Sequence, residues 1–238
     1  MVTIEAAARR DEVSHGFYLA WSLVMAGVFI AGFSQTVPDD FASPRFPLLL
    51  MVHGAVFTGW IVLTIAQPAL VMAGDIGRHR QLGIAGAGLA AAMVAMGVSA
   101  TVLTVATHNV PSFFPKGIFL VMNLLVIGVF GALVAAAVRL RRQADWHKRL
   151  MLCATASILG PGLGRFLPMP AFGDFAPLVM FALNDAILLA GPAADLVARR
   201  KVHPAYVWGV ATVVASQVLI GPLGLSPLAK AAVRALGG

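Results

Sequence analysis

The amino-acid sequence predicts an all-α protein, a polytopic bundle of about seven transmembrane helices whose N-terminus is cytoplasmic. Its composition is that of a membrane protein, because 59% of the 238 residues are hydrophobic and only 11% are charged, against roughly 25% charged residues in a soluble domain. Its apolar runs reach about 20 residues, the length that a helix needs to cross a bilayer. Its Lys and Arg residues gather in alternate connections between those runs, as expected of a chain that crosses a membrane repeatedly.

Seven apolar runs supply the expected spans. The polar segment 1–15 precedes them without a convincing cleavage site, so we expect a short cytoplasmic N-terminal segment and no signal peptide. The transmembrane domain covers 16–223, and its fifth run is the least secure because Gly160-Pro161 interrupts it. The last segment, 224–238, is typical of either an interfacial helix or a frayed tail, and both alternatives stay open. The seven runs are 16–36, 47–72, 82–107, 114–138, 148–168, 174–198 and 204–223.

The basic residues orient this chain. If every run crosses, twelve of the 17 Lys and Arg residues fall on one side, whereas the opposite connections hold only Arg45 and Lys116. Basic connections stay in the cytoplasm, so we expect a multi-pass protein of the bacterial inner membrane. These charges also suit anionic lipid headgroups, and nothing in the pattern indicates nucleic-acid binding. The twelve are Arg9, Arg10, Arg78, Arg80, Arg139, Arg141, Arg142, Lys148, Arg149, Arg199, Arg200 and Lys201.

Several polar residues lie inside the outer half of the predicted spans, where burial in hydrocarbon is costly. With a rise of about 1.5 Å per residue, His53, Asn123 and Asp185 lie roughly 9–16 Å below the outer surface, and the long side chain of Arg165 can reach inward to them. We expect Asp185 to face the bundle interior and to meet His53 or Arg165. The set predicts either an outward-facing binding pocket or a polar network that only holds helices together. Its members are His53, Asn123, Arg165, Asn184 and Asp185.

Histidines mark the cytoplasmic edge. His79 and His147 stand at the starts of the third and fifth runs, which both cross outward. Neutral imidazole is a common ligand of haem iron and of other transition metals. The sequence therefore predicts that these two side chains form a metal or haem b site, with arginines that suit haem propionates. The simpler alternative is that each histidine is an ordinary interfacial residue. The arginines are Arg78, Arg80 and Arg149.

Two patches carry a family resemblance. The patches, 51–83 and 147–166, resemble a family of uncharacterised bacterial polytopic membrane proteins with H-R-x-x-G and H-[RK]-R-x-M signatures. That family is similar in layout to the cytochrome b561 and ferric-reductase-like proteins, which implies haem b. The chain departs from two-haem bundles because no run carries two histidines about 13–14 residues apart, so one haem is expected. The matching residues are His53, Gly54, Gln67, His79, Arg80, Gly83, His147, Arg149, Met151 and Arg165.

Three functions stay open at this point. The first is electron transfer with one haem b, or with another metal or a quinone. The second is a small-molecule carrier or sensor that uses the outward-facing polar pocket. The third is an accessory subunit packed against other membrane subunits. The sequence has no phosphate-binding loop, no H-E-x-x-H motif and no Ser/His/Asp set, which argues against a hydrolase or an ATP-driven pump.

Overall fold

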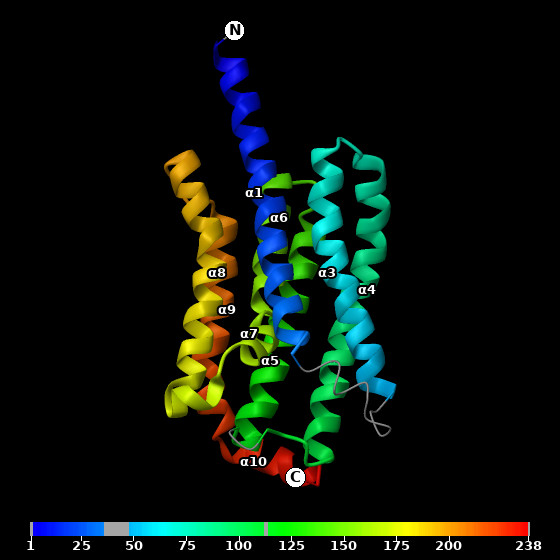
Figure 1. The fold of residues 1–238 in the computed structure, drawn as a ribbon, viewed down its shortest axis with the longest axis vertical. Helices are drawn as coiled ribbons and strands as arrows, with labels where there is room; N and C mark the ends of the chain where they lie inside the picture. The colour runs from blue at the N-terminus through cyan, green and yellow to red at the C-terminus, as the bar shows by residue number, and fades with distance from the viewer. Residues whose placement is uncertain (1, 36–47, 112–113, 238) are drawn as a thin grey trace.

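The structure is a computed structural model that describes residues 2–35, 48–111 and 114–237, with the backbone alone for residues 2–15, 50 and 174. Every regular element in these ranges is helical, as the sequence predicts. Figure 1 shows the helices packed side by side along one axis. The elements are α1 (Val2–Phe33), α3 (Leu48–Met72), α4 (Ile76–Ala106), α5 (Lys116–Arg139), α6 (Ala144–Ser157), α7 (Gly160–Phe166), the 3-10 helix η1 (Met169–Phe175), α8 (Ala176–Arg199), α9 (Pro204–Gly224) and α10 (Pro227–Ala235).

Six of these helices are long and apolar enough to cross a membrane, which makes the chain a multi-pass membrane protein. The fifth predicted run is different, because it is divided into α6, of 14 residues, and α7, of seven residues. At about 1.5 Å per residue, α6 extends for only about 21 Å, less than the hydrocarbon core of a bilayer. The division falls at Ile158 and Leu159, directly before the Gly160-Pro161 pair that the sequence marks as a breaker. The six long helices are α1, α3, α4, α5, α8 and α9.

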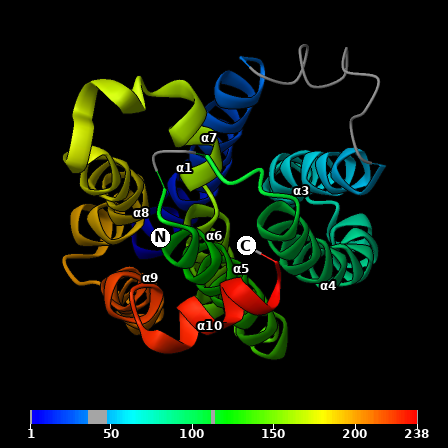
Figure 2. The same cartoon turned by 90° about the horizontal axis from the view of Figure 1, so that it is seen from below.

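The short helix α6 lies in the centre of the bundle, with longer helices around it. Figure 2, which looks along the bundle, shows α6 beside α5, with α8 and α9 on one side and α3 and α4 on the other. α5 packs against α4, α6 and α9, and α1 packs against α3 and α7. From Arg149 to Ser157 every residue of α6 except Met151 is buried. The central position of α6 places its polar side chains away from lipid.

Two glycines allow α1 and α7 to approach closely. A Cβ atom on Gly32 of α1 would overlap the backbone carbonyl oxygen of Gly162 in α7. Because the obstructing atom belongs to the backbone, no side-chain rotation could relieve the overlap. The contact fixes the distance between the first helix and the second half of the divided run.

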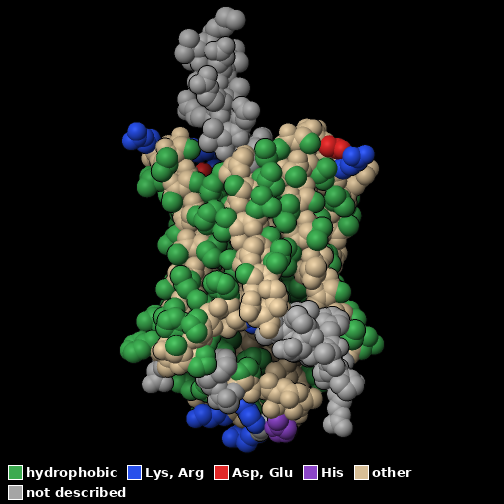
Figure 3. Space-filling model, viewed as in Figure 1, with side chains coloured by type: hydrophobic (Ala, Val, Ile, Leu, Met, Phe, Trp, Pro, Cys, Tyr) green, Lys and Arg blue, Asp and Glu red, His purple; other side chains and the backbone are tan. Residues whose placement is uncertain are grey.

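Most of the charged side chains lie at the two ends of the molecule. In Figure 3 Lys and Arg appear at both ends, and hydrophobic side chains cover the band between them. The α3–α4, α5–α6 and α8–α9 turns lie at the same end as the N-terminus, whereas α10 and the C-terminus lie at the other. The end that holds the N-terminus and these three turns is the basic end. Arg45 lies outside the described residues, and residues 227–235 form helix α10, which packs against α5 and α9.

Candidate functional site

The first turns of α4 and α6 bring His79 and His147 together at the basic end. Their ring centroids are 6.4 Å apart and the ring planes are nearly perpendicular, at 87°. Both helices pack against α5, which holds their starts at one level. Asp75 caps α4, because its side chain accepts a hydrogen bond from the backbone N–H of Arg78. The pairing predicted from the sequence is therefore present as a close approach of the two imidazoles.

Each imidazole is held through its Nδ1 atom. Nδ1 of His147 lies 2.9 Å from the carbonyl oxygen of Ala137 in α5. A carbonyl only accepts, so Nδ1 of His147 carries the proton and its Nε2 atom keeps a lone pair when the ring is neutral. Nδ1 of His79 instead accepts a hydrogen bond from the side-chain amide of Gln67 in α3. A neutral His79 then carries its proton on Nε2, so the two rings have opposite hydrogen-bonding characters.

Gln67 joins α3 to the first turns of α4. Its amide nitrogen also donates to the backbone oxygen of His79, at 3.2 Å, and its amide oxygen accepts from the backbone N–H of Gly83, at 3.0 Å. Gln67, His79, Gly83 and His147 all belong to the patches that carry the family resemblance. The structure thus brings four of those residues to one place at the basic end.

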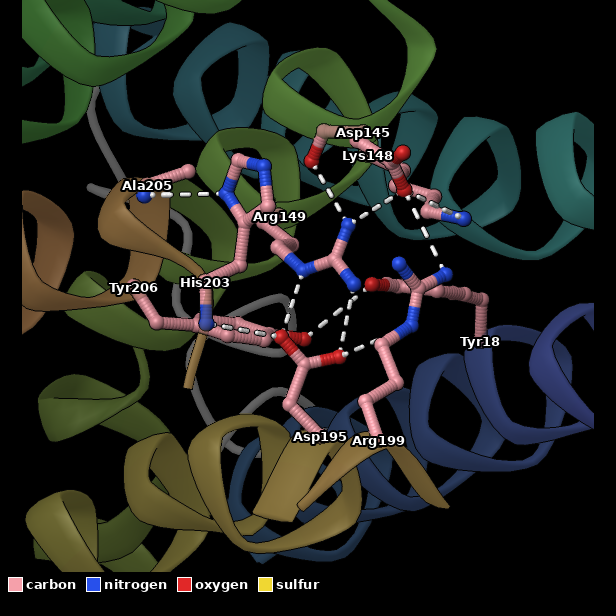
Figure 4. Close-up of polar contacts among 9 residues, drawn as sticks. All are labelled: Tyr18, Asp145, Lys148, Arg149, Asp195, Arg199, His203, Ala205 and Tyr206. Carbon is pink, nitrogen blue, oxygen red and sulfur yellow. Dashed lines mark hydrogen bonds and ion pairs between the residues drawn. The ribbon is translucent and has the colours of Figure 1, made fainter. Parts of the chain in front are cut away.

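Arg149, predicted to meet a haem propionate, is fully buried and makes ion pairs within the chain. Its Nε and Nη2 atoms donate to the two carboxylate oxygens of Asp195 in α8, at 2.8 and 2.6 Å. Its Nη1 atom donates to the carboxylate and the backbone oxygen of Asp145, at 2.7 and 2.9 Å. Figure 4 shows the guanidinium between these two carboxylates. Arg149 thus makes four hydrogen bonds to two acidic residues and joins α6 to α8.

Further polar groups extend these contacts into the Arg149 network, which joins α1, α6, α8 and α9 (Figure 4). Arg199 approaches the carboxylate of Asp145 at 3.4 Å and that of Asp195 at 3.8 Å. The backbone N–H of His203 donates to Asp195 at 3.1 Å. Two tyrosine hydroxyls, one from α1 and one from α9, lie 3.2 Å apart beside the guanidinium. The network consists of Tyr18, Asp145, Lys148, Arg149, Asp195, Arg199, His203 and Tyr206.

The acidic partners in this network were not recognised in the sequence. Asp195 lies only four residues before the basic Arg199-Arg200-Lys201 run, so it resembles an ordinary interfacial charge. The feature of the sequence that could have revealed Asp195 is an acidic residue that still lies inside the apolar run 174–198.

Asp145, on the first turn of α6, has its pKa held at about 2, because hydrogen bonds from Arg149 and Lys148 outweigh the desolvation that opposes its charge.

The two other arginines predicted for the cofactor stay at the surface. Arg78 pairs with Asp75 at 3.3 Å, and its side chain is 75% exposed. Arg80 is also exposed. Both therefore lie on the α4 side of the histidine pair, with side chains that remain accessible.

The residues of the predicted polar pocket come from four helices, and their described contacts are largely local. Asn123 donates to the backbone of its own helix, and Arg165 donates to Pro161 and lies over the ring of Phe33, 4.5 Å from its centroid. Asp185 accepts a hydrogen bond from Gln217 of α9 at 2.8 Å.

Two atoms of this predicted pocket are buried polar groups. Nδ1 of His53 and Oδ1 of Asn184 have no hydrogen-bond partner among the described residues. The His53 ring stacks on Phe57, with centroids 4.2 Å apart. Asn184 is 4% exposed. These two atoms are the features of the predicted pocket that the described residues leave without a hydrogen-bond partner.

Comparison with known proteins does not assign the chain to a family. No protein-family model, curated protein or solved structure matches the chain. Within the described ranges, no group of three or more His, Cys, Asp and Glu side chains is placed to hold a metal ion. The family resemblance and the haem that it implies therefore stay predictions.

Proposed function

We propose that the chain is a seven-span inner-membrane protein that binds one redox cofactor, haem b, between His79 and His147 for electron transfer. The observation that carries this proposal is the 6.4 Å separation of two imidazoles from helices that are distant in sequence. With metal–nitrogen bonds of about 2.0–2.1 Å, two imidazoles at roughly this separation would be able to hold one metal ion between them. The spacing of the pair therefore suits two ligands of a single metal.

The hydrogen bonds of the two rings also suit this role. Metal-binding histidines almost always engage their second nitrogen with a neighbouring group, which orients the ring. Ala137 serves His147 in this way and leaves its Nε2 lone pair free. For His79 to bind through Nε2, its proton must move to Nδ1, and Gln67 must then turn its amide oxygen toward that atom. When bound, haem b supplies a one-electron iron couple whose potential responds to such hydrogen bonds.

Charge at the basic end supports the binding of an acidic cofactor. The positive charge of Arg149 is already matched by Asp145 and Asp195. Arg80 is exposed, and the pair of Arg78 with Asp75 is at the surface and readily exchanged, so these two side chains on the helix of His79 are the ones available for the propionates of haem.

The seven-span topology rests on the course of the chain through α6 and α7. In Figure 1, α5 ends at the basic end and α8 begins at the opposite end, so the chain crosses between them through these two short helices. The turns at the basic end and the helix ends that flank them hold ten of the 17 Lys and Arg residues. By the positive-inside rule this end lies in the cytoplasm, together with the N-terminus.

The optical spectrum of the full chain, purified in detergent from cells supplied with haem precursor, tests the cofactor. We expect a Soret band whose reduced-minus-oxidised difference is that of a b-type haem. His79→Ala and His147→Ala should lose this band, whereas His108→Ala, at the exposed opposite end, should retain it. Circular dichroism of each variant checks that the helices are intact. A wild-type protein without a Soret band, or variants that keep it, would contradict the proposal.

A second candidate function, a small-molecule carrier or sensor, is favoured by the two unsatisfied atoms of His53 and Asn184. Buried polar atoms within a membrane are costly unless they meet a partner, and a ligand could supply it. A thermal-shift screen of small polar compounds tests this candidate. Any stabilising compound should lose its effect in Asn184→Leu, and an unchanged shift would exclude Asn184 from the site.

A further inference from the structure

The α8–α9 turn at the basic end forms a cavity of about 420 Å³ that is independent of the histidine pair. It is lined by Arg199, Lys201, Val202, His203 and Pro204. The turn is tight, because Arg200 adopts a left-handed conformation with φ of 56°. This conformation ends α8 and directs the next residues toward the start of α9. A turn of defined backbone conformation therefore forms the cavity.

The polar groups that line the cavity are donors. Lys201 is exposed, and the side chain of Arg199 is 32% exposed. Nδ1 of His203 accepts a hydrogen bond from the backbone N–H of Ala205 at 3.1 Å, so the proton of the neutral ring is on Nε2. Desolvation by burial, helped by the nearby Arg149 charge, lowers the pKa of His203 and keeps the ring neutral near pH 7. Two cations and an N–H donor indicate an anionic ligand.

The acidic residues near the cavity do not neutralise the positive charge of the residues around it. Asp145 and Asp195 each meet Arg149 and Arg199, and Asp145 also meets Lys148. Two carboxylates therefore face three cations within the Arg149 network, which leaves one positive charge in excess. Arg200 and Lys201 follow directly in the chain and add two more. The potential around the cavity is thus positive, and it attracts anions.

Apolar surface on both sides of the turn distinguishes a lipid from a soluble anion. On α8, Leu196 is 54% and Val197 82% exposed, and on α9, Val207 is 58% and Trp208 68% exposed. Such side chains near the end of a spanning helix face acyl chains, and Trp prefers the headgroup level. A ligand with a phosphate beside acyl chains meets both the cationic cavity and this apolar flank. Inorganic phosphate would use only the cavity.

We propose that the cavity at the α8–α9 turn binds the phosphate group of an anionic phospholipid. Arg199 and Lys201 attract its charge, and Nε2–H of His203 donates to one of its oxygens. Basic recesses between helices at the cytoplasmic surface are suited to acidic headgroups. The site is separate from the proposed cofactor site and does not depend on it.

Native mass spectrometry of the full-length protein tests the site, with phosphatidylglycerol and phosphatidylcholine as probes. Both lipids carry a phosphate, but only phosphatidylglycerol has a net negative charge. We expect wild-type protein to retain phosphatidylglycerol preferentially, and Lys201→Gln to weaken its binding about fivefold, as expected for one basic residue near a membrane surface. Arg142→Gln, in the exposed α5–α6 turn at the same end, removes an equal charge and should leave the binding unchanged.

Three outcomes would overturn the proposal. Equal weakening by Lys201→Gln and Arg142→Gln would mean that diffuse charge alone attracts the lipid. Equal retention of the two lipids would mean that the cavity does not select an acidic headgroup. Displacement of bound phosphatidylglycerol by millimolar inorganic phosphate would assign the cavity to a soluble anion. A wild-type preference for phosphatidylglycerol that survives added phosphate and falls only in Lys201→Gln would support it.

Discussion

The buried pair of Arg149 and Asp195 permits a stability prediction that does not depend on any cofactor. The two side chains are 1% and 8% exposed, and Asp195 accepts two hydrogen bonds from the guanidinium. Removing one partner of a buried ion pair typically costs 3–5 kcal/mol, because the other charge stays buried without compensation. Asp195→Asn keeps one acceptor oxygen and leaves Asp145 in place, so we expect about 3 kcal/mol, the low end of that range.

The assay is thermal unfolding of the purified protein in one detergent, followed by tryptophan fluorescence. For a chain of this size a loss of about 3 kcal/mol lowers the unfolding temperature by roughly 6–12 °C. The matched control is Asp75→Asn, which breaks an exposed pair worth about 0–1 kcal/mol and retains a residue able to cap α4. If both variants unfold at the same temperature, the buried pair contributes no more than an exposed one and the reasoning fails.

Three other changes have defined expectations. Gly32→Ala should cost about 1–3 kcal/mol, because its methyl group meets a backbone carbonyl of α7, whereas Gly27→Ala, which has open space, should be tolerated in the same unfolding assay. Gln67→Leu removes the partner of His79 and should weaken cofactor binding about 10–100-fold in a haem titration, and unchanged binding would exclude Gln67 from orienting the ring. The depressed pKa of Asp145, about 2, predicts stability that is full above its ordinary pKa near 4 and lost as pH falls toward 2. Asp145→Asn should flatten this dependence of the unfolding temperature on pH, and an unaltered profile would contradict the assignment.

The features predicted correctly from the sequence are those that local composition determines. Run length and hydropathy are enough to predict a multi-pass helical protein, and Gly160-Pro161 reveals where the fifth run divides, because a proline removes a backbone hydrogen bond wherever it lies. The level of His79 and His147 also follows from topology, since both begin helices at the same end of the bundle. These predictions need no knowledge of which helices are neighbours.

The features that were missed depend on helix neighbours and on rotation about each helix axis. The depth of a residue along a span can be counted from the sequence, but the neighbouring helix that its side chain faces cannot. The sequence therefore predicts that Asp185 meets His53 or Arg165, whereas in the structure it accepts a hydrogen bond from Gln217. The pairing of Arg149 with Asp195 joins α6 to α8 across 46 residues. Nothing in the spacing of either residue specifies that contact, which arises only when α6 becomes the buried centre of the bundle.

The central position of α6 links the Arg149 network to the histidine pair. Residues two apart in a helix point in nearly opposite directions, because each residue turns the helix by about 100°. Arg149 therefore attaches one face of α6 to α8, and His147 presents the other face to α5 and to His79. The buried ion pair adds a constraint on the rotation of α6 about its axis, beyond the packing of its buried residues. The first turn of α6 thus positions the imidazole of His147 through charges that point away from it.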